Sequence, residues 1–197
     1  MVNLSWQEAL DNLKAGNQNF VADKLVGKLQ DSSRRAKLTG GQNPYAIILS
    51  CADSRVVPEL AFDKGLGEIF VIRVAGNVSN TESIASIEYA VAHLGVNLIV
   101  VLGHESCGAV TAAIAGGDNG YNLNILLSQI NPAVAQAGTT EVNAVVKLNA
   151  KLAAQDMVDR SSILAGKLDS GDLAIIPAYY NLGSGAVDFM EEEKLTA

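Results

Sequence analysis

Residues 97–108 read NLIVVLGHESCG, and this stretch decides the fold class. Its first half is a near-continuous apolar run of strand length, without polar alternation, which is typical of a strand covered on both faces in a parallel α/β sheet. Similar runs occur over residues 45–50, 69–74 and 173–180. Stretches that favour helices, with a break at Asn131–Pro132, cover residues 81–94, 107–115, 123–130 and 142–164. The pattern predicts an α/β fold with a mostly parallel central sheet flanked by helices.

The two ends of the chain add to this core. Ser5 and Glu8 have the spacing of a capping box, so we expect a helix over about residues 5–22. Residues 1–40 are predicted to form an N-terminal helical arm, and residues 186–189 a short antiparallel strand at the C-terminal edge. No repeat or long linker interrupts the 197 residues, so we expect a single domain over 1–197.

Composition excludes several classes of function. Hydrophobic residues make up 49% of the chain, too many for a disordered protein. The formal net charge of −7 provides no positive field for nucleic acid. No apolar run approaches the roughly 20 residues of a membrane span, and the N-terminus lacks the pattern of a signal or transit peptide. We therefore expect a cytoplasmic protein that binds neither nucleic acid nor membrane.

Chemistry-bearing side chains follow two of the predicted strands. Cys51, Asp53 and Arg55 follow the first strand, and His104 and Cys107 follow the strand quoted above. In parallel sheets, ligands bind beyond the carboxyl ends of the strands, where such loops converge. Two thiolates and one imidazole suit Zn²⁺, and three protein ligands leave one position open for catalysis. The sequence predicts one zinc ion per chain at this edge.

Asp53 and Arg55 are candidates for the surroundings of the metal. Asp53 is predicted either to fill the fourth position or to accept a hydrogen bond from water bound there, and Arg55 is placed to hold it as a bidentate ion pair. Two thiolates neutralise the charge of Zn²⁺, so nearby positive or hydrogen-bonding groups must help to acidify that water. Arg55 and the helix N-terminus expected near Cys107 are available.

Four segments from about Gly41 to Phe189 carry a family resemblance, namely CADSRVVPEL, GEIFVIRVAGNV, SIEYAVAHLGV and GHESCGAV. They resemble the β-class carbonic anhydrases. The resemblance implies Cys51, His104 and Cys107 as zinc ligands, and Asp53 with Arg55 as the catalytic dyad that orients zinc-bound hydroxide. It also implies a narrow substrate pocket at a dimer interface. The residues that match this pocket are Gln42, Phe70, Ala75 and Tyr89.

The reaction implied is the reversible hydration of carbon dioxide to bicarbonate and a proton, by attack of zinc-bound hydroxide. The resemblance further implies a homodimer or a dimer of dimers. His93, on a predicted helix, shows no evident route for carrying the proton away from the zinc.

Some family members have a closed form in which the aspartate binds zinc, stabilised by bicarbonate at a site that includes a tryptophan. This chain has Ile48 at the tryptophan position, although Arg73 and Tyr179 or Tyr180 resemble the rest of that site. We therefore expect an open, water-bearing zinc at neutral pH.

Two other functions are compatible with the same residues. One is hydrolysis of a carbon dioxide isostere, carbonyl sulfide or carbon disulfide, at the same zinc. The other is a non-catalytic zinc or redox module, closed by Asp53 or oxidised between Cys51 and Cys107; the pairing of Arg55 with Asp53 argues against permanent closure.

Overall fold

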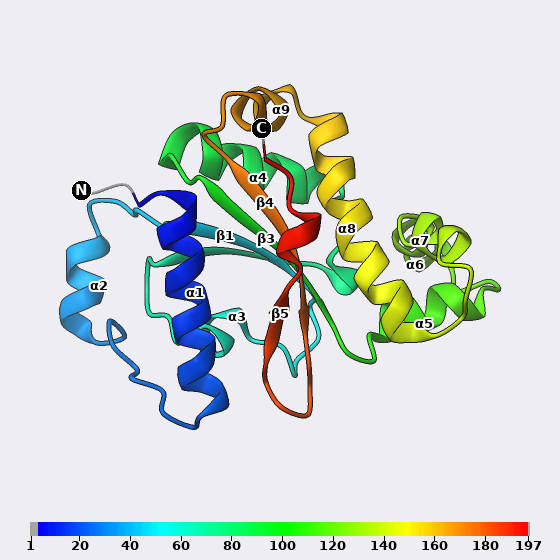
Figure 1. Ribbon diagram of the computed structural model, residues 1–197, viewed down its shortest axis with the longest axis horizontal. Coiled ribbons are helices and arrows are strands. Elements are labelled where there is room, and N and C mark those ends of the chain that lie inside the picture. The colour runs from blue at the N-terminus through cyan, green and yellow to red at the C-terminus, as the bar shows by residue number, and fades with distance from the viewer. Residues whose placement is uncertain (1–3, 197) are drawn as a thin grey trace.

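The computed structural model describes residues 4–196, and in that range five strands form one sheet (Figure 1). The order across the sheet is β2-β1-β3-β4-β5. Strands β1 to β4 are parallel and β5 is antiparallel to β4. Their bounds are β1 Ala46–Ser50, β2 Ile69–Arg73, β3 Leu98–His104, β4 Ala174–Tyr180 and β5 Val187–Phe189. The predicted α/β fold, with its mostly parallel sheet and antiparallel C-terminal edge, is confirmed.

Helices connect and cover the strands. The α-helices are α1 Trp6–Val21, α2 Ser32–Leu38, α3 Pro58–Ala61, α4 Thr81–Leu94, α5 Gly108–Ala115, α6 Tyr121–Ser128, α7 Asn131–Gln136, α8 Val142–Arg160 and α9 Ser162–Asp169, and the 3-10 turns are η1 Ala75–Asn77 and η2 Glu191–Glu193. Helix α1 begins at the predicted capping box of Ser5 and Glu8. None of these helices, within residues 4–196, is long and apolar enough to cross a membrane.

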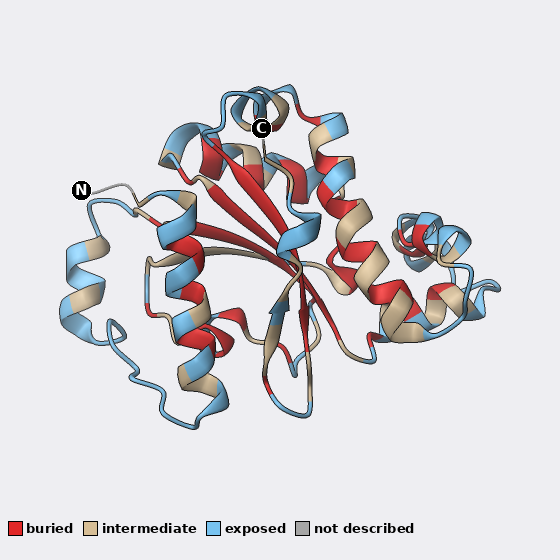
Figure 2. Cartoon of the chain, in the orientation of Figure 1, coloured by how far each residue is buried: buried red, intermediate tan, exposed pale blue. Residues whose placement is uncertain are grey.

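Every residue of the central strands β1, β3 and β4 is buried (Figure 2). Because successive side chains of a strand point to opposite faces of the sheet, both faces are covered. Ile47, Ile99 and other side chains of one face pack in a cluster with residues of α4 and α8. Ile48 and Val100, on the other face, pack with residues of α1 and α3. The two-sided cover explains why these strands are apolar without alternation.

A third cluster of buried side chains lies beyond the carboxyl ends of the strands. It joins Cys51 and Cys107 to apolar residues of α5, α6, α7 and α8. Figure 1 shows α5, α6 and α7 gathered beside the N-terminal half of α8. This arrangement seals one side of the loops that follow β1 and β3.

The helix predicted over residues 142–164 is wrong as a single element. Its chain breaks at Ser161, which leaves the helical region with φ −123° and ψ 108°. The Ser161 hydroxyl donates to Glu88 and accepts from the amide of Leu164, so the same side chain ends α8 and caps α9. The predicted break at Asn131–Pro132 separates α6 from α7, where the proline occupies the first turn of the new helix.

Candidate metal centre

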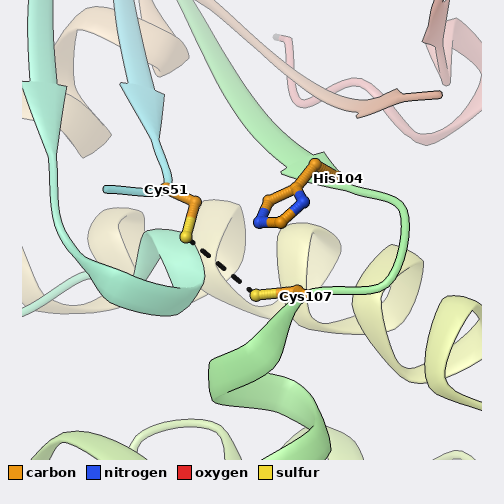
Figure 3. Close-up of side chains that lie close together, drawn as sticks. All are labelled: Cys51, His104 and Cys107. Carbon is orange, nitrogen blue, oxygen red and sulfur yellow. Dashed lines mark hydrogen bonds between the residues drawn. The ribbon is translucent and has the colours of Figure 1, made fainter. Parts of the chain in front are cut away.

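The site begins with the parallel pairing of β1 and β3. Ser50 pairs with Leu102, so both strands end at the same edge of the sheet. Cys51 directly follows β1, His104 is the last residue of β3, and Cys107 is the N-cap residue of α5. Figure 3 shows the His104 ring facing the two sulfurs. One ligand atom from each of these residues lies within 4.8 Å of the others, and all three residues are buried.

The imidazole of His104 is oriented for binding a metal. Its Nδ1 lies 2.9 Å from the carbonyl oxygen of Glu105, and because a carbonyl only accepts, Nδ1 carries the proton. The lone pair is then on Nε2. This atom is buried and has no hydrogen-bond partner within residues 4–196. An unpartnered buried nitrogen that faces two sulfurs is what a site for a cation requires.

The two cysteines form a close pair. Their Sγ atoms lie 4.0 Å apart, and two thiolates bound to one tetrahedral Zn²⁺ at about 2.3 Å lie roughly 3.8 Å apart. Hydrogen bonding with Cys107 lowers the pKa of Cys51 to about 4, against the effect of burial. The same pairing, together with burial, raises the pKa of Cys107. The two sulfurs are within hydrogen-bond distance of each other, and a metal bound to both would take the place of that hydrogen bond.

Hydrogen bonds from the Gly76 amide and the Arg73 side chain hold the Cys51 loop in place. The amide of Gly76, in the turn η1, donates to Cys51 Sγ at 3.3 Å. The Arg73 guanidinium donates to the carbonyl oxygens of Cys51, at 3.0 Å, and Asp53, at 2.7 Å. The sulfur therefore already has one backbone donor, which offsets part of the thiolate charge. Sequence reasoning missed Gly76, because an amide donor leaves no side-chain pattern to find.

Asp53 and Arg55 form a two-pronged ion pair beside the cluster. Arg55 Nε lies 2.9 Å from Asp53 Oδ1, and a terminal guanidinium nitrogen lies 2.7 Å from Oδ2. Hydrogen bonding from Arg55 holds the pKa of the Asp53 carboxyl well below its usual range, although burial opposes it. Oδ2 also lies 3.8 Å from His104 Nε2. An ionised carboxylate, which only accepts hydrogen bonds, is therefore fixed at the edge of the metal cluster.

Known proteins place this arrangement in a family. Residues 46–187 match the family model described as carbonic anhydrase. Carbonic anhydrase 2 of Mycobacterium tuberculosis is 40% identical over 180 residues, which cover 88% of this chain and 87% of that protein. A β-carbonic anhydrase of Coccomyxa, solved in complex with acetazolamide, superposes with a TM-score of 0.73 at 28% identity and covers 92% of this chain and 86% of that chain.

The chain belongs to the β-class carbonic anhydrases. A structure from work on two tetrameric β-carbonic anhydrases of Sordaria macrospora has the same fold, with a TM-score of 0.74 at 23% identity over 93% of this chain and 97% of that chain. The general reaction of a β-carbonic anhydrase is the hydration of carbon dioxide, and this chain is accordingly a carbonate dehydratase. Its Cys51, His104 and Cys107 form a group able to hold the metal of such an enzyme.

The residues predicted for the substrate pocket of this carbonic anhydrase lie on the side of β2. Phe70 is a residue of β2, and its ring centroid lies 6.5 Å from that of Tyr89 on α4. Ala75 begins the turn η1 that also holds Gly76. Phe70 and Ala75 are half-buried and Tyr89 is exposed. Gln42 is exposed in the segment before β1. In the single chain described, Gln42 and Tyr89 are open to solvent.

Three further residues named from the sequence have clear places. Ile48 is fully buried within β1, so the position of the family tryptophan is filled by the core. Arg73 is bound to the Cys51 loop, as described above. His93 is exposed on α4, where its ring lies 5.3 Å from that of Tyr89.

Proposed function

We propose that this β-carbonic anhydrase catalyses the zinc-dependent, reversible hydration of carbon dioxide to bicarbonate and a proton, with one Zn²⁺ held by Cys51, His104 and Cys107. The observation that carries the proposal is the buried Nε2 of His104, which has no hydrogen-bond partner among residues 4–196. It faces a pair of sulfurs at zinc spacing beside the Asp53–Arg55 pair. Three protein ligands leave room for a fourth, which distinguishes a catalytic from a structural site.

Bound to these ligands, Zn²⁺ supplies the Lewis acidity that makes a water molecule nucleophilic near neutral pH. The residues of the chain set the rest of the chemistry. Asp53 stays ionised because Arg55 holds it, so it would accept a hydrogen bond from a water molecule beside Cys51, His104 and Cys107 and would orient that molecule. Because both carboxylate oxygens are bonded to Arg55, Asp53 is restrained from moving onto the metal. This favours the open state of the site.

The electrostatics of the site suit an anionic product. With Zn²⁺ held by Cys51, His104 and Cys107, the two thiolates would cancel its charge, so the site would present no net positive charge to bicarbonate. The Gly76 amide withdraws charge from Cys51, and the Arg55 guanidinium lies next to Asp53. Both effects favour ionisation of a water molecule at the open position, which the two thiolates oppose.

The proposed active enzyme contains at least two copies of the chain, so its smallest assembly is a homodimer. Strand β2 is an edge strand whose sequence IFVIR is mostly apolar, yet none of its residues is fully buried. An apolar edge strand is normally covered, because it otherwise pairs with other chains. Phe70 and Tyr89, the residues proposed to line an apolar pocket for carbon dioxide, lie beside this edge. Gln42 is proposed to donate an amide hydrogen bond to a substrate oxygen.

The test is stopped-flow carbon dioxide hydration by purified protein of measured metal content and measured mass in solution. The proposal expects one zinc per chain, a rate that depends on that zinc, and an assembly of at least two chains. Tightly bound zinc without turnover would overturn the proposed catalysis. Protein that is reduced and folded but binds no zinc would overturn the proposed metal centre.

A further inference from the structure

The turn that donates to Cys51 and the loop between His104 and Cys107 are both hydrogen-bonded to helix α8. Asn149 of α8 donates its side-chain amide to the carbonyl oxygen of Gly76 at 2.8 Å. Asn143, in the first turn of α8, accepts a hydrogen bond from the amide of Ser106 at 2.9 Å. Gly76 is the residue that donates to Cys51 Sγ, and Ser106 lies between His104 and Cys107. Asn149 therefore bonds to a residue that itself bonds to the ligand Cys51, and Asn143 bonds to the residue that precedes the ligand Cys107.

We propose that Asn149 and Asn143 are positioning residues, which hold the Gly76 turn against Cys51 and the Ser106 loop between His104 and Cys107. The inference rests on the proposed zinc-dependent function and adds to it a pair of residues that touch neither metal nor substrate. Helix α8 then sets the separation of the ligands, although it supplies none of them.

The Gly76 turn needs such a brace. Gly76 and Asn77 both have positive φ, of 70° and 45°, and Asn77 is not a glycine. Asparagine adopts this left-handed conformation more readily than most residues, but the conformation still has a cost that contacts around the turn must offset. On one side, Ile130 leaves no room above Gly76, because a Cβ there would lie 2.6 Å from Ile130 Cδ1. On the other side, Asn149 is 3% exposed and bonds to the carbonyl oxygen. The Gly76 amide is thereby held in its direction toward Cys51.

The Ser106 loop shows the same need. Ser106 has φ 54°, which is again a left-handed conformation of a residue other than glycine. Asn143 binds its amide, and the position of Asn143 is fixed by Glu141, which caps the amides of Asn143 and Ala144. A loop that must bring His104 and Cys107 to one point is thus tied to the start of a 19-residue helix.

The two asparagines act with opposite ends of the amide, which gives the experiment its controls. Asn149 donates to a carbonyl, so both Asn149→Leu and Asn149→Asp remove the interaction. Asn143 accepts from an amide, so Asn143→Leu removes the interaction but Asn143→Asp keeps it. Gln155, also on α8, bonds only to Asp159 among the residues described, and Gln155→Met is the matched control on the same helix.

Three measurements on the full-length variants test the proposal. Zinc affinity is measured by competition with a chromophoric chelator. The thiolate-to-metal absorption band is recorded after substitution with Co²⁺, and the amide resonance of Gly76 is recorded in the metal-free protein. Thermal unfolding of the metal-free protein reports any general loss of stability.

We expect Asn149→Leu and Asn149→Asp to weaken zinc binding by about 10- to 100-fold, the usual effect of losing a group that orients a ligand. The Co²⁺ band should move to lower energy, because a sulfur without its amide donor gives up electrons more easily, and the Gly76 resonance should shift. Asn143→Leu should weaken zinc binding while Asn143→Asp and Gln155→Met stay close to the parent protein.

Two results would overturn the inference. The first is Asn149 variants that are less stable but keep the parent zinc affinity, Co²⁺ band and Gly76 resonance, which is a purely structural role. The second is equal effects of Asn143→Leu and Asn143→Asp. If the parent protein bound no zinc while the Gly76 resonance still moved in the Asn149 variants alone, the proposed function would fail and the bracing of the turn by Asn149 would stand.

Discussion

Substitution of Gly103 by alanine, at the contact between β3 and α8, has two opposing effects on stability: a steric clash and a smaller loss of backbone entropy on folding. A Cβ added at Gly103 would lie 2.9 Å from Val146 Cγ1, 3.4 Å from the carbonyl oxygen of Val146 and 3.7 Å from Ala150 Cβ. Only the first distance is shorter than real Cβ contacts allow. Val146 is β-branched and 1% exposed, so its methyl group has little room to move. Gly103→Ala therefore forces β3 and α8 apart directly before His104.

The magnitude follows from opposing terms. Overpacking a core typically costs about 1 to 3 kcal/mol, whereas alanine is better than glycine in a strand by about 0.5 to 1 kcal/mol. We expect Gly103→Ala to lower the free energy of unfolding by up to about 2.5 kcal/mol as the balance of these terms. Val146→Ala alone removes two buried methyl groups and should cost about 1.5 to 3 kcal/mol.

The double variant Gly103→Ala with Val146→Ala tests whether the clash with Val146 causes the loss of stability. With alanine at 146 the close contact is gone, so Gly103→Ala should now stabilise the protein by about 0.5 to 1 kcal/mol. The sign of the effect changes, and the coupling energy between the two sites is about 1 to 3 kcal/mol. Carbon dioxide hydration should fall in Gly103→Ala and recover in the double variant, because the displaced residue precedes His104.

Equilibrium urea unfolding of the four proteins, at one fixed zinc concentration, measures the cycle. Gly166→Ala is the matched control, because Gly166 is an exposed helical residue and an added Cβ there would meet no neighbouring atom within 4 Å. This substitution should stabilise the protein equally with valine or with alanine at 146. Additive effects of Gly103→Ala and Val146→Ala would refute the steric reasoning.

Three further predictions concern the metal, the dyad and pH. Removal of zinc by a chelator should abolish carbon dioxide hydration, and one equivalent of Zn²⁺ per chain should restore it in a reconstitution titration. Asp53→Ala should keep one zinc per chain by elemental analysis but lose turnover in stopped flow, and Arg55→Lys should fall between, because lysine keeps the charge without the two-pronged geometry. Asp63 should make stability depend on pH. Burial acts to raise the pKa of Asp63, but hydrogen bonds from Asn19, Val26 and Gly27 outweigh it and lower the pKa. Because the pKa of Asp63 is lower in the folded than in the unfolded state, the ionised carboxylate stabilises the fold at pH values above its unfolded-state pKa, and this stabilisation is lost as the pH falls through the folded-state pKa. Asp63→Asn should therefore destabilise the protein near pH 7. The difference in stability between variant and parent should disappear in unfolding curves recorded in acid.

The strands could be predicted from the sequence because their apolarity follows directly from burial on both faces. Short helices were harder. The polar α2 has no buried residue, and α3 is a single turn that starts at Pro58, so neither has an apolar face with a helical period. At the break between α8 and α9, Ser161 caps the amide of Leu164 and also donates to Glu88, 73 residues away in the chain. Local sequence around 161 holds no glycine or proline to indicate it.

The residues of the site also fall into those that could be predicted from the sequence and those that depend on contacts between distant segments. Cys51, Asp53, Arg55, His104 and Cys107 could be named in advance because they follow two strands that end at one edge, and their chemistry is in their side chains. Gly76 acts through its backbone amide, and neither Asn149 nor Asn143 has a neighbour in sequence that marks it. Their partners are 73 and 37 residues away. Only the packing of α8 against the sheet brings them into contact.

Helix α8 therefore connects the stability of the core to the geometry of the metal ligands. Val146 lies between Asn143 and Asn149 in the chain, and it packs on Gly103, directly before His104. A displacement of α8 from β3 would move both asparagine contacts together, and with them Ser106 and the Gly76 amide. A metal site whose ligands come from loops is precise only if the loops are tied to a rigid element. In this chain that element is a helix that contributes no ligand, so the effects of core substitutions at its contact with β3 should appear in metal affinity as well as in stability.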